Sequence, residues 1–357
     1  MEPSRDQLLE ALGQVIDPEL RRPVTELDMV RAVDVEAGHV SVTIALTVAG
    51  CPLRSSFEDQ VRAVFRDVPG VSGVSLAFDV MSPEERTALT QKLRGGLNER
   101  TKGLSLDAAT RVVAVCSGKG GVGKSTLTAN LAIALSQLGQ RVGVLDADVY
   151  GHSIPHILGI SQKPVLVDRM IVPPVKNDLK LMSIGFFLDD NQPVMWRGPM
   201  LHRALEQFLS DVHWGELDVL VVDMPPGTGD VAISLGQLLP RAETIVVTTP
   251  QPAAQEVAAR AGVMAQKTGM RLVGVVENMS GDVFGSGGGE RLAKELSIPL
   301  LGRVPLDPIV RECGDAGEPV VAAAPDAPTA AELRRIASSV VELRAGTIVK
   351  PLSLVSQ

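Results

Sequence analysis

The 357-residue sequence is poor in aromatic residues and has no excess of positive charge. Aromatic residues make up 3% of it, so a buried core must be built mainly from Val, Leu, Ile and Ala. The net charge of −8 and the pI near 5.3 argue against a dedicated nucleic-acid-binding protein, because such proteins usually carry a basic face. The five histidines are scattered along the chain. With 45% hydrophobic and 21% charged residues, the composition indicates a globular protein.

Long hydrophobic runs and closely spaced cysteines are also missing. No apolar run approaches the roughly 18 residues that a membrane-spanning helix needs. The N-terminal residues lack the basic-then-apolar profile of a signal peptide. The three cysteines, Cys51, Cys116 and Cys313, are odd in number and far apart, which is typical of a reducing compartment rather than of a disulfide framework. We therefore expect a cytoplasmic protein without a membrane span.

The character of the sequence changes near residue 110. Residues 1–90 are predicted to form a small α+β domain, and the charged, glycine-containing stretch 91–108 is interpreted as a linker. In residues 109–357 short β-branched runs alternate with helical segments, which predicts an α/β domain with a doubly wound, mostly parallel sheet. Within the first domain the apolar periodicity predicts helices and strands over these ranges: helices 7–16 (ended by Asp17-Pro18) and 55–65, strands 39–48 and 74–80.

A phosphate-binding sequence follows the strand predicted at Val112–Cys116. The sequence SGKGGVGKST fits the pattern G-x-x-x-x-G-K-[ST], and a helix is predicted directly after it. Glycines let successive backbone N–H groups face phosphate oxygens, and the helix N-terminus adds a positive dipole end. Lys124 is expected to reach the β- and γ-phosphates, and the Ser125 hydroxyl to bind Mg²⁺. The predicted nucleotide-binding residues of this loop are Gly118, Lys119, Gly120, Gly121, Val122, Gly123, Lys124, Ser125 and Thr126.

Aspartates follow two further predicted strands of the same sheet. Asp223 follows four apolar residues and fits a Walker B element, in which the aspartate holds Mg²⁺. Asp146 and Asp148 end another strand, and right-handed crossovers bring such strand ends to one edge of the sheet. Carboxylates that close to a triphosphate would repel it unless they served Mg²⁺ or a water molecule. A helix-capping role stays open as an alternative for Asp146 and Asp148.

The segment KGGVGKST resembles the deviant Walker A motif of the MinD/ParA/nitrogenase-iron-protein class. The resemblance implies that Lys119 crosses a homodimer interface to the partner's phosphates, much as an arginine finger does; a solvated lysine is the alternative. It also implies that Asp148 orients the attacking water, with Asp146 near the magnesium shell. By the same resemblance Asn278 reads adenine and the segment around Pro305 closes over the base, whereas a turn-forming role is the alternative for Asn278.

The resemblance extends over nearly the whole chain. Several segments are similar to the Mrp/ApbC family of iron–sulfur cluster carrier ATPases: DADVYGHSIP, residues 194–209, DMPPGTGD, TTPQ and VVENMS. The first domain, with DPEL at 17–20 and GCPL at 50–53, resembles the MIP18-type (DUF59) domain. This family membership implies a Mg²⁺-dependent ATP-hydrolysing homodimer. It also implies that the dimer binds an iron–sulfur cluster, commonly [4Fe–4S], and passes it to apoproteins, with assembly factors as other possible partners.

The cysteine pair that the family usually carries after the ENMS segment is absent, because this stretch reads ENMSGDVFGSGGGERLAKEL. Iron–sulfur clusters need thiolate-type ligands. Cys116 is interpreted as a core residue and Cys313 as structural. Cys51 precedes Pro52 after a predicted strand and matches the characteristic cysteine of the resembled N-terminal domain, so it is the candidate cluster ligand, with structural packing as the alternative. An ATP-dependent dimeric switch or scaffold of the MinD/ParA type, which does not itself ligate a cluster, remains the alternative function.

Overall fold

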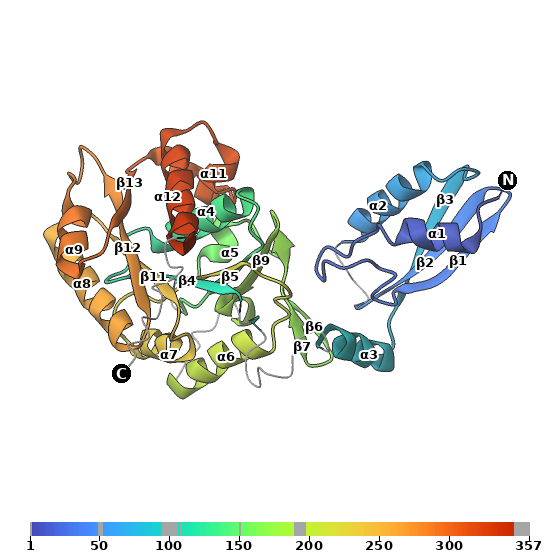
Figure 1. Cartoon of the computed structure of the whole chain (residues 1–357), viewed down its shortest axis with the longest axis horizontal. Coiled ribbons are helices and arrows are strands. Elements are labelled where there is room, and N and C mark those ends of the chain that lie inside the picture. The colour runs from blue at the N-terminus through green and yellow to red at the C-terminus, as the bar shows by residue number, and fades with distance from the viewer. Residues whose placement is uncertain are drawn as a thin grey trace, which may run out of the picture. The chain divides into compact units, whose positions relative to one another are not determined.

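The computed structural model describes residues 2–48, 53–94, 106–107, 109–149, 151–188 and 198–345, and the chain divides into two compact units (Figure 1). The first unit comprises Met1–Ser105, Pro164–Val175 and Ser210–Gly215, and the second comprises the rest of the chain. Two short segments from the later part of the sequence therefore belong to the first unit. Most of the predicted linker 91–108 lies outside the described residues.

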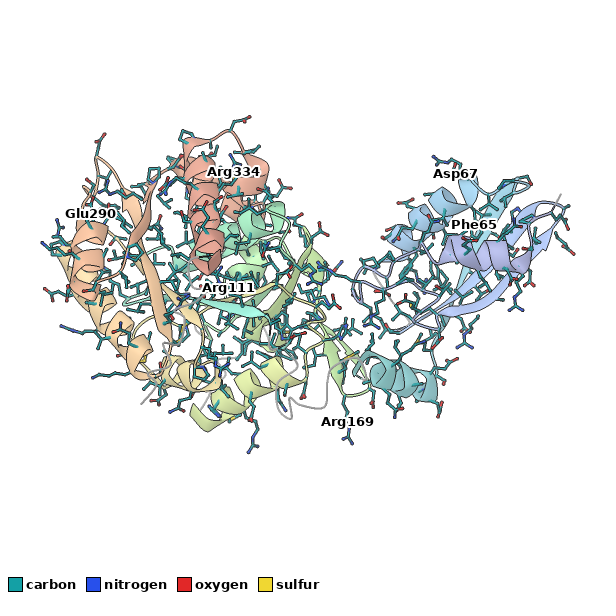
Figure 2. The ribbon with its side chains drawn as sticks, in the orientation of Figure 1. Phe65, Asp67, Arg111, Arg169, Glu290 and Arg334 are labelled. Atoms are coloured by element: carbon teal, nitrogen blue, oxygen red, sulfur yellow. The ribbon has the colours of Figure 1, made fainter. Side chains whose placement is uncertain are left out.

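The first unit is built on a sheet of strand order β1-β2-β3. β1 pairs with β2 in antiparallel fashion, and β2 runs parallel to β3. The strands and helices of this unit are β1 (Val30–Glu36), β2 (His39–Leu46), β3 (Gly73–Val80), α1 (Arg5–Leu12), α2 (Arg54–Arg66), α3 (Pro83–Arg94) and the hairpin β6 (Val165–Val167) and β7 (Met170–Val172). Helix α2 buries Phe57, Val61 and Phe65, which are four residues apart and so share one face of the helix. Phe65 is labelled in Figure 2. Val167, Met170 and Val172 join the same core cluster, which explains why the hairpin belongs to this unit.

Helix α1 ends four residues before its predicted end at residue 16. The Gly13 N–H donates to the Leu9 carbonyl (2.9 Å) and closes the helix there. Asp17 forms a separate turn, in which its carboxylate accepts hydrogen bonds from the Glu19 and Leu20 N–H groups, both at 2.8 Å. The apolar periodicity continues past Gly13 because Val15 is also buried, so the pattern alone overestimates the length of the helix.

The second unit contains a sheet of order β13-β12-β11-β4-β10-β5-β9-β8. Every neighbouring pair from β13 to β9 is parallel, which confirms the predicted doubly wound, mostly parallel fold. The strands are β4 (Arg111–Ser117), β5 (Val142–Asp146), β8 (Val175–Lys176), β9 (Leu179–Ser183), β10 (Val219–Asp223), β11 (Glu243–Thr248), β12 (Arg271–Ser280) and β13 (Leu300–Pro305).

Helices cover this sheet in two packed pairs, α4 with α12 and α8 with α9 (Figure 1). Val113 and Val115 of β4 share a core cluster with α4 and α12, and Ala114 and Cys116 between them are buried as well. Since successive residues of a strand point to opposite faces, both faces of the sheet are covered. The helices are α4 (Lys124–Gln137), α5 (Ile154–Ile157), α6 (Gly198–Ser210), α7 (Asp230–Leu238), α8 (Pro252–Lys267), α9 (Gly288–Leu296), α10 (Pro308–Asp315), α11 (Val320–Ala323) and α12 (Pro328–Ala345), with a 3-10 helix at Ile184–Phe187.

Arg111 ties the start of β4 to two other elements (Figure 2). Its Nε donates to Glu243 Oε2 of β11 at 2.5 Å, and its Nη1 donates to the Val340 carbonyl of α12 at 2.5 Å. The side chains of Arg111 and Glu243 are both mostly buried, so each charge needs the other as its partner. Within the described residues, no helix is both long and apolar enough to cross a membrane.

Helix α4 offers a direct test of this packing. Leu131 is fully buried (0% exposed), whereas Leu138 at the end of the same helix is 46% exposed. We expect Leu131→Ala to lower the free energy of unfolding by about 2–5 kcal/mol, because it leaves a cavity, and Leu138→Ala to lower it by less than about 0.5 kcal/mol. Urea-induced unfolding followed by circular dichroism measures both, and equal losses would contradict the placement of α4.

Candidate functional site

Polar side chains gather where neighbouring parallel strands end. The register places Asp223 of β10 opposite Asp146 of β5, and Asp146 opposite Ser183 of β9. On the other side of β10, strand β4 leads directly into the predicted phosphate-binding loop. The topology therefore brings the loop and the predicted aspartates to one edge of the sheet.

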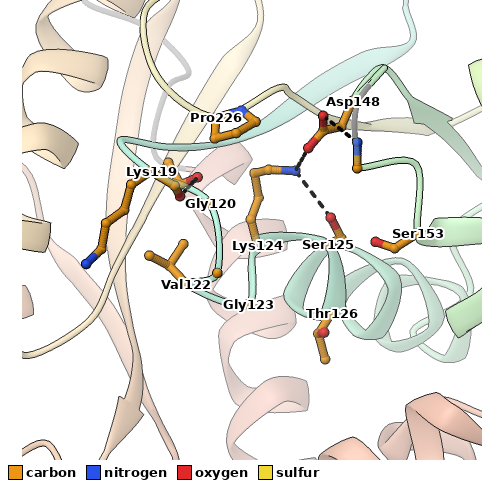
Figure 3. Close-up of a pocket in the computed structure, with 13 residues that line it drawn as sticks. Lys119, Gly120, Val122, Gly123, Lys124, Ser125, Thr126, Asp148, Ser153 and Pro226 are labelled. Atoms are coloured by element: carbon orange, nitrogen blue, oxygen red, sulfur yellow. Dashed lines mark hydrogen bonds and ion pairs between the residues drawn. The ribbon is translucent and has the colours of Figure 1, made fainter. Parts of the chain in front are cut away.

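The phosphate-binding loop surrounds a cavity of about 380 Å³ (Figure 3). The loop can approach its neighbours this closely only because two positions are glycine. A Cβ added to Gly118 would lie 2.1 Å from the backbone carbonyl carbon of Val257, and Gly123 has φ +80°, a region that favours glycine. The cavity is lined by Ser117, Lys119, Gly120, Gly121, Val122, Gly123, Lys124, Ser125, Thr126, Asp148, Gly151, Ser153 and Pro226.

Lys124 is the buried cation of the site. Its Nζ lies 2.7 Å from Asp223 Oδ2 and 3.7 Å from Asp148 Oδ2. The same Asp223 carboxylate accepts hydrogen bonds from Ser125 Oγ (2.6 Å) and Thr128 Oγ1 (2.8 Å). A buried charge is tolerated only when it is paired, so Lys124 and Asp223 stabilise each other inside the sheet edge.

The other two aspartates are held by local hydrogen bonds. Asp146, fully buried, accepts from Ser183 Oγ (2.9 Å) and from the Asp148 N–H (3.2 Å). Burial raises the pKa of Asp146 well above its ordinary value, and the nearby Asp223 carboxylate raises it further. Asp148 accepts from the Gly151 N–H at 3.1 Å. Neither aspartate caps a helix, since the next helix, α5, begins at Ile154.

Lys119 lies on the rim of the cavity and differs from Lys124 in its surroundings. Its side chain is exposed and extends away from Lys124 (Figure 3). Of these two lysines, it is Lys124 that contacts the Asp148 and Asp223 carboxylates of the same chain. The predicted role of Lys119 in a partner subunit stays a prediction.

Asn278 lies against the phosphate-binding loop. Its Nδ2 donates to the Val122 carbonyl oxygen at 2.8 Å, so the side chain bonds to the loop rather than to its own turn. Pro305 ends strand β13 and is exposed, and its partner across the strands is Ser280, two residues after Asn278. Both predicted base-binding residues are thus at the edge of the sheet that carries the loop.

Thr128 and Ser183 belong to the site but were not predicted. Thr128 lies one helical turn after Lys124, and this i, i+4 spacing could have indicated it. Ser183 ends a parallel strand, so the same rule that identified Asp146 and Asp223 applies to it. Each hydroxyl bonds to an aspartate carboxylate and fixes its orientation.

The donor chemistry of the site fits Mg²⁺. Ser125, Asp146 and Asp223 offer the oxygen ligands that this ion prefers. Among the described residues, no group of three or more His, Cys, Asp or Glu side chains is placed to hold a metal ion. Mg²⁺ usually takes one or two ligands from protein carboxylates and the others from phosphate oxygens and water.

The described cysteines are poor candidates for cluster ligands. Cys116 is buried in β4, and burial raises the pKa of its thiol to about 12. Burial and the nearby carboxylates of Glu312 and Glu318 also raise the pKa of the half-buried Cys313 thiol. Cys51 lies outside the described residues.

A tight turn follows β12, in the segment where the resemblance described above implies a cysteine pair. Gly281 and Gly285 exchange two backbone hydrogen bonds at 2.9 and 2.7 Å. Val283 and Phe284 at the tip of the turn are exposed, at 72% and 41%. The turn therefore presents an apolar tip and no thiol.

Comparisons with known proteins agree with this geometry. Residues 108–341 match the family model for the NUBPL iron-transfer P-loop NTPase, and residues 5–76 match the model for an iron–sulfur cluster assembly protein. An iron–sulfur cluster carrier protein of Mycobacterium leprae is 54% identical over 344 residues, which cover 92% of this chain and 90% of the relative. One from Synechocystis is 41% identical over 351 residues, covering 94% and 96%.

Solved structures show the same relationship. A nucleotide-binding protein from Archaeoglobus fulgidus in complex with ADP is 36% identical with a TM-score of 0.51, covering 58% of this chain and 86% of its own. The septum site-determining protein MinD from Pyrococcus horikoshii, complexed with Mg-ADP, is 25% identical with a TM-score of 0.52, covering 68% and 100%. The family match over most of the chain confirms the resemblance seen in the sequence: this chain belongs to the NUBPL iron-transfer P-loop NTPase family.

Proposed function

We propose that this protein is an ATP-hydrolysing iron–sulfur cluster carrier, which binds a cluster and transfers it to apoproteins. The observation that carries the ATPase part is the convergence of Lys124, Ser125, Asp148 and Asp223 on one glycine-lined cavity. The cluster-carrying part is supported by the relatives of high identity that are named iron–sulfur cluster carrier proteins. The ADP-bound and Mg-ADP-bound structural neighbours support a nucleotide in the cavity.

Nucleotide binding exchanges one set of charge pairs for another. Lys124, which contacts Asp223 and Asp148 in this structure, turns to the β- and γ-phosphates. The backbone N–H groups of residues 118–126 and the amino end of α4 add further positive potential. Ser125 and Asp223, with Asp146 nearby, would hold Mg²⁺, which would supply positive charge to the phosphate oxygens.

Hydrolysis requires a positioned water and a second positive charge. Asp148 borders the cavity next to Lys124, and we assign it to the attacking water. Lys119, which extends away from its own site, is assigned to the nucleotide of a second copy of the chain in a homodimer. Asn278 and Pro305 are assigned to the adenine base at the neighbouring strand ends.

The cluster is the cargo of the carrier, and its ligand in this chain is assigned to Cys51. Iron–sulfur clusters are held by thiolates, and the other two thiols are buried or half-buried with raised pKa values. The clients are apo-iron–sulfur proteins or assembly factors, and we expect the protein to act in the cytoplasm.

A second function is favoured by one specific observation. The turn at Gly281–Gly285 carries no cysteine, and its tip is apolar. A dimeric ATP-dependent switch or scaffold, which needs no thiol at this place, would retain the whole ATP site and lack the cluster.

Lys124→Ala is expected to weaken ATP binding by roughly 100-fold or more, because it removes the ammonium group that faces the phosphates. Isothermal titration calorimetry with Mg²⁺ and ATP measures the affinity, and circular dichroism confirms that the variant is folded. Lys119→Ala serves as the matched control and should bind ATP like the wild type. Wild-type affinity in Lys124→Ala would contradict the assignment.

Lys119→Ala is expected to lower the rate of phosphate release by at least about 10-fold, since a charge supplied in trans stabilises the transition state. Mixing this variant with Lys124→Ala provides a sharper test. Lys124→Ala is expected to bind ATP weakly but still carries Lys119, so mixed dimers should recover part of the lost activity. Unchanged turnover in Lys119→Ala, or no recovery on mixing, would refute a role in trans.

Anaerobic reconstitution with iron and sulfide tests the cargo. We expect the wild-type protein and the Cys116→Ser variant to show a broad visible absorption band, because the Cys116 thiol is buried in β4. Cys51→Ser should lose the band. A colourless wild-type protein would favour the scaffold function, and a band that persists in Cys51→Ser would exclude this cysteine as the essential ligand.

A further inference from the structure

Strand β12 carries a β-bulge at residues 277–280, near its carboxyl end and directly beside the phosphate-binding loop. Its register with β13 shifts between Glu277 and Ser280. Within this stretch Met279 has φ +59°, in the left-handed region that side chains other than glycine rarely adopt. Bulges near functional sites often redirect a side chain, and strained backbone persists only where the surrounding structure holds it.

Hydrogen bonds hold this bulge on both sides. The fully buried Glu277 carboxylate accepts hydrogen bonds from the Gly287 N–H (3.2 Å) and the Gly289 N–H (2.5 Å) at the start of α9. After the bulge, the Ser280 carbonyl accepts a hydrogen bond from the Leu306 N–H at 2.9 Å. The backbone of residues 277–280 is therefore anchored before and after Met279.

The bulge places Asn278 on the phosphate-binding loop in one orientation. The Val122 carbonyl oxygen can only accept, so the amide nitrogen of Asn278 must face it, as the 2.8 Å contact shows. Gly123 leaves the space for this contact, because an added Cβ would lie 2.2 Å from Asn278 Nδ2 and 3.6 Å from Met279 Cε. The bond to Val122 prevents the amide from rotating, and Oδ1 is fixed as an acceptor.

We propose that Met279 is a positioning residue for base recognition, which through its left-handed backbone locks the Asn278 amide so that the site selects a 6-amino purine over a 6-oxo purine. The inference rests on the proposed nucleotide site. A 6-amino group donates to the fixed Oδ1, whereas a 6-oxo group meets it with a second acceptor. An amide free to rotate could turn its NH₂ group to a 6-oxo purine and would discriminate poorly between the two.

The test compares the affinities for ATP and ITP, which carry the same phosphates and differ at position 6 of the purine. The wild type should prefer ATP by roughly 10-fold or more, the effect of replacing one hydrogen bond by two opposed acceptors. Met279→Gly should keep this ratio, because glycine adopts positive φ freely. Met279→Val should reduce it to within about threefold, because a β-branched residue is strongly disfavoured there.

Asn278→Ala provides an independent variant that removes the amide. It leaves neither a donor to the Val122 carbonyl nor a fixed acceptor for the base, so the ATP preference should again fall to within about threefold. A wild-type ratio in both Met279→Val and Asn278→Ala would overturn the proposal. Loss of the ratio in Met279→Gly would also overturn it, because the side chain and not the backbone would then be responsible.

Inorganic tripolyphosphate separates this inference from the proposed function, because it occupies the phosphate-binding loop without a base. A wild-type protein that binds tripolyphosphate and ATP but shows no preference for ATP over ITP overturns the role of Met279 and leaves the ATP site standing. A wild-type protein that binds neither tripolyphosphate nor ATP overturns both.

Discussion

The candidate site depends on a buried ammonium group held between carboxylates. Lys124 Nζ lies 2.7 Å from Asp223 Oδ2 and 3.7 Å from Asp148 Oδ2, at an edge where Asp146 is buried as well. Without this cation the carboxylates would repel each other in a region of low dielectric constant. The same lysine is the group that a triphosphate needs, and the same aspartate is the group that Mg²⁺ needs. The triphosphate can therefore bind Lys124 while Mg²⁺ binds Asp223, so that the two ligands together replace the internal Lys124–Asp223 ion pair.

The architecture of the second unit and the position of its site could be predicted from the sequence. Apolar runs alternating with helical segments indicate a parallel sheet, and the carboxyl ends of such strands share an edge. That rule predicts that the phosphate-binding loop, Asp146 and Asp223 lie at one edge of the sheet, and the register of β4, β10 and β5 shows them there. The family resemblance added roles for Lys119 and Asn278 that the spacing of residues alone does not give.

Other features depend on packing between distant parts of the chain and could not be predicted. The hairpin at Val165–Val172 joins the core of the first unit, although it lies more than 60 residues after the helices and strands it contacts. Met279 adopts a left-handed backbone against its own preference, because hydrogen bonds at Glu277 and Ser280 fix the chain on both sides. The end of α1 at Leu12 was also predicted wrongly, for a different reason. Val15 is buried although it lies beyond the helix, so the apolar periodicity of the sequence continues past the end of α1.

The two halves of the proposed function rest on different residues. The proposed nucleotide site brings together the glycines of the loop, Lys124, and the hydroxyls of Ser125 and Thr128, which bond to Asp223. The turn after β12, in contrast, presents Val283 and Phe284 where the resembled family carries thiols. Relatives that share 41–54% identity with this chain are named as cluster carriers, so the cargo site and the ATP site need to be tested separately.

The most direct test of the central claim is a structure determined with Mg²⁺ and a non-hydrolysable ATP analogue. The account predicts that Lys124 Nζ leaves Asp223 Oδ2, now 2.7 Å away, and contacts phosphate oxygens, while Ser125 turns its hydroxyl from Asp223 to the metal. A structure in which the Lys124–Asp223 pair is intact and the analogue is bound elsewhere would contradict it.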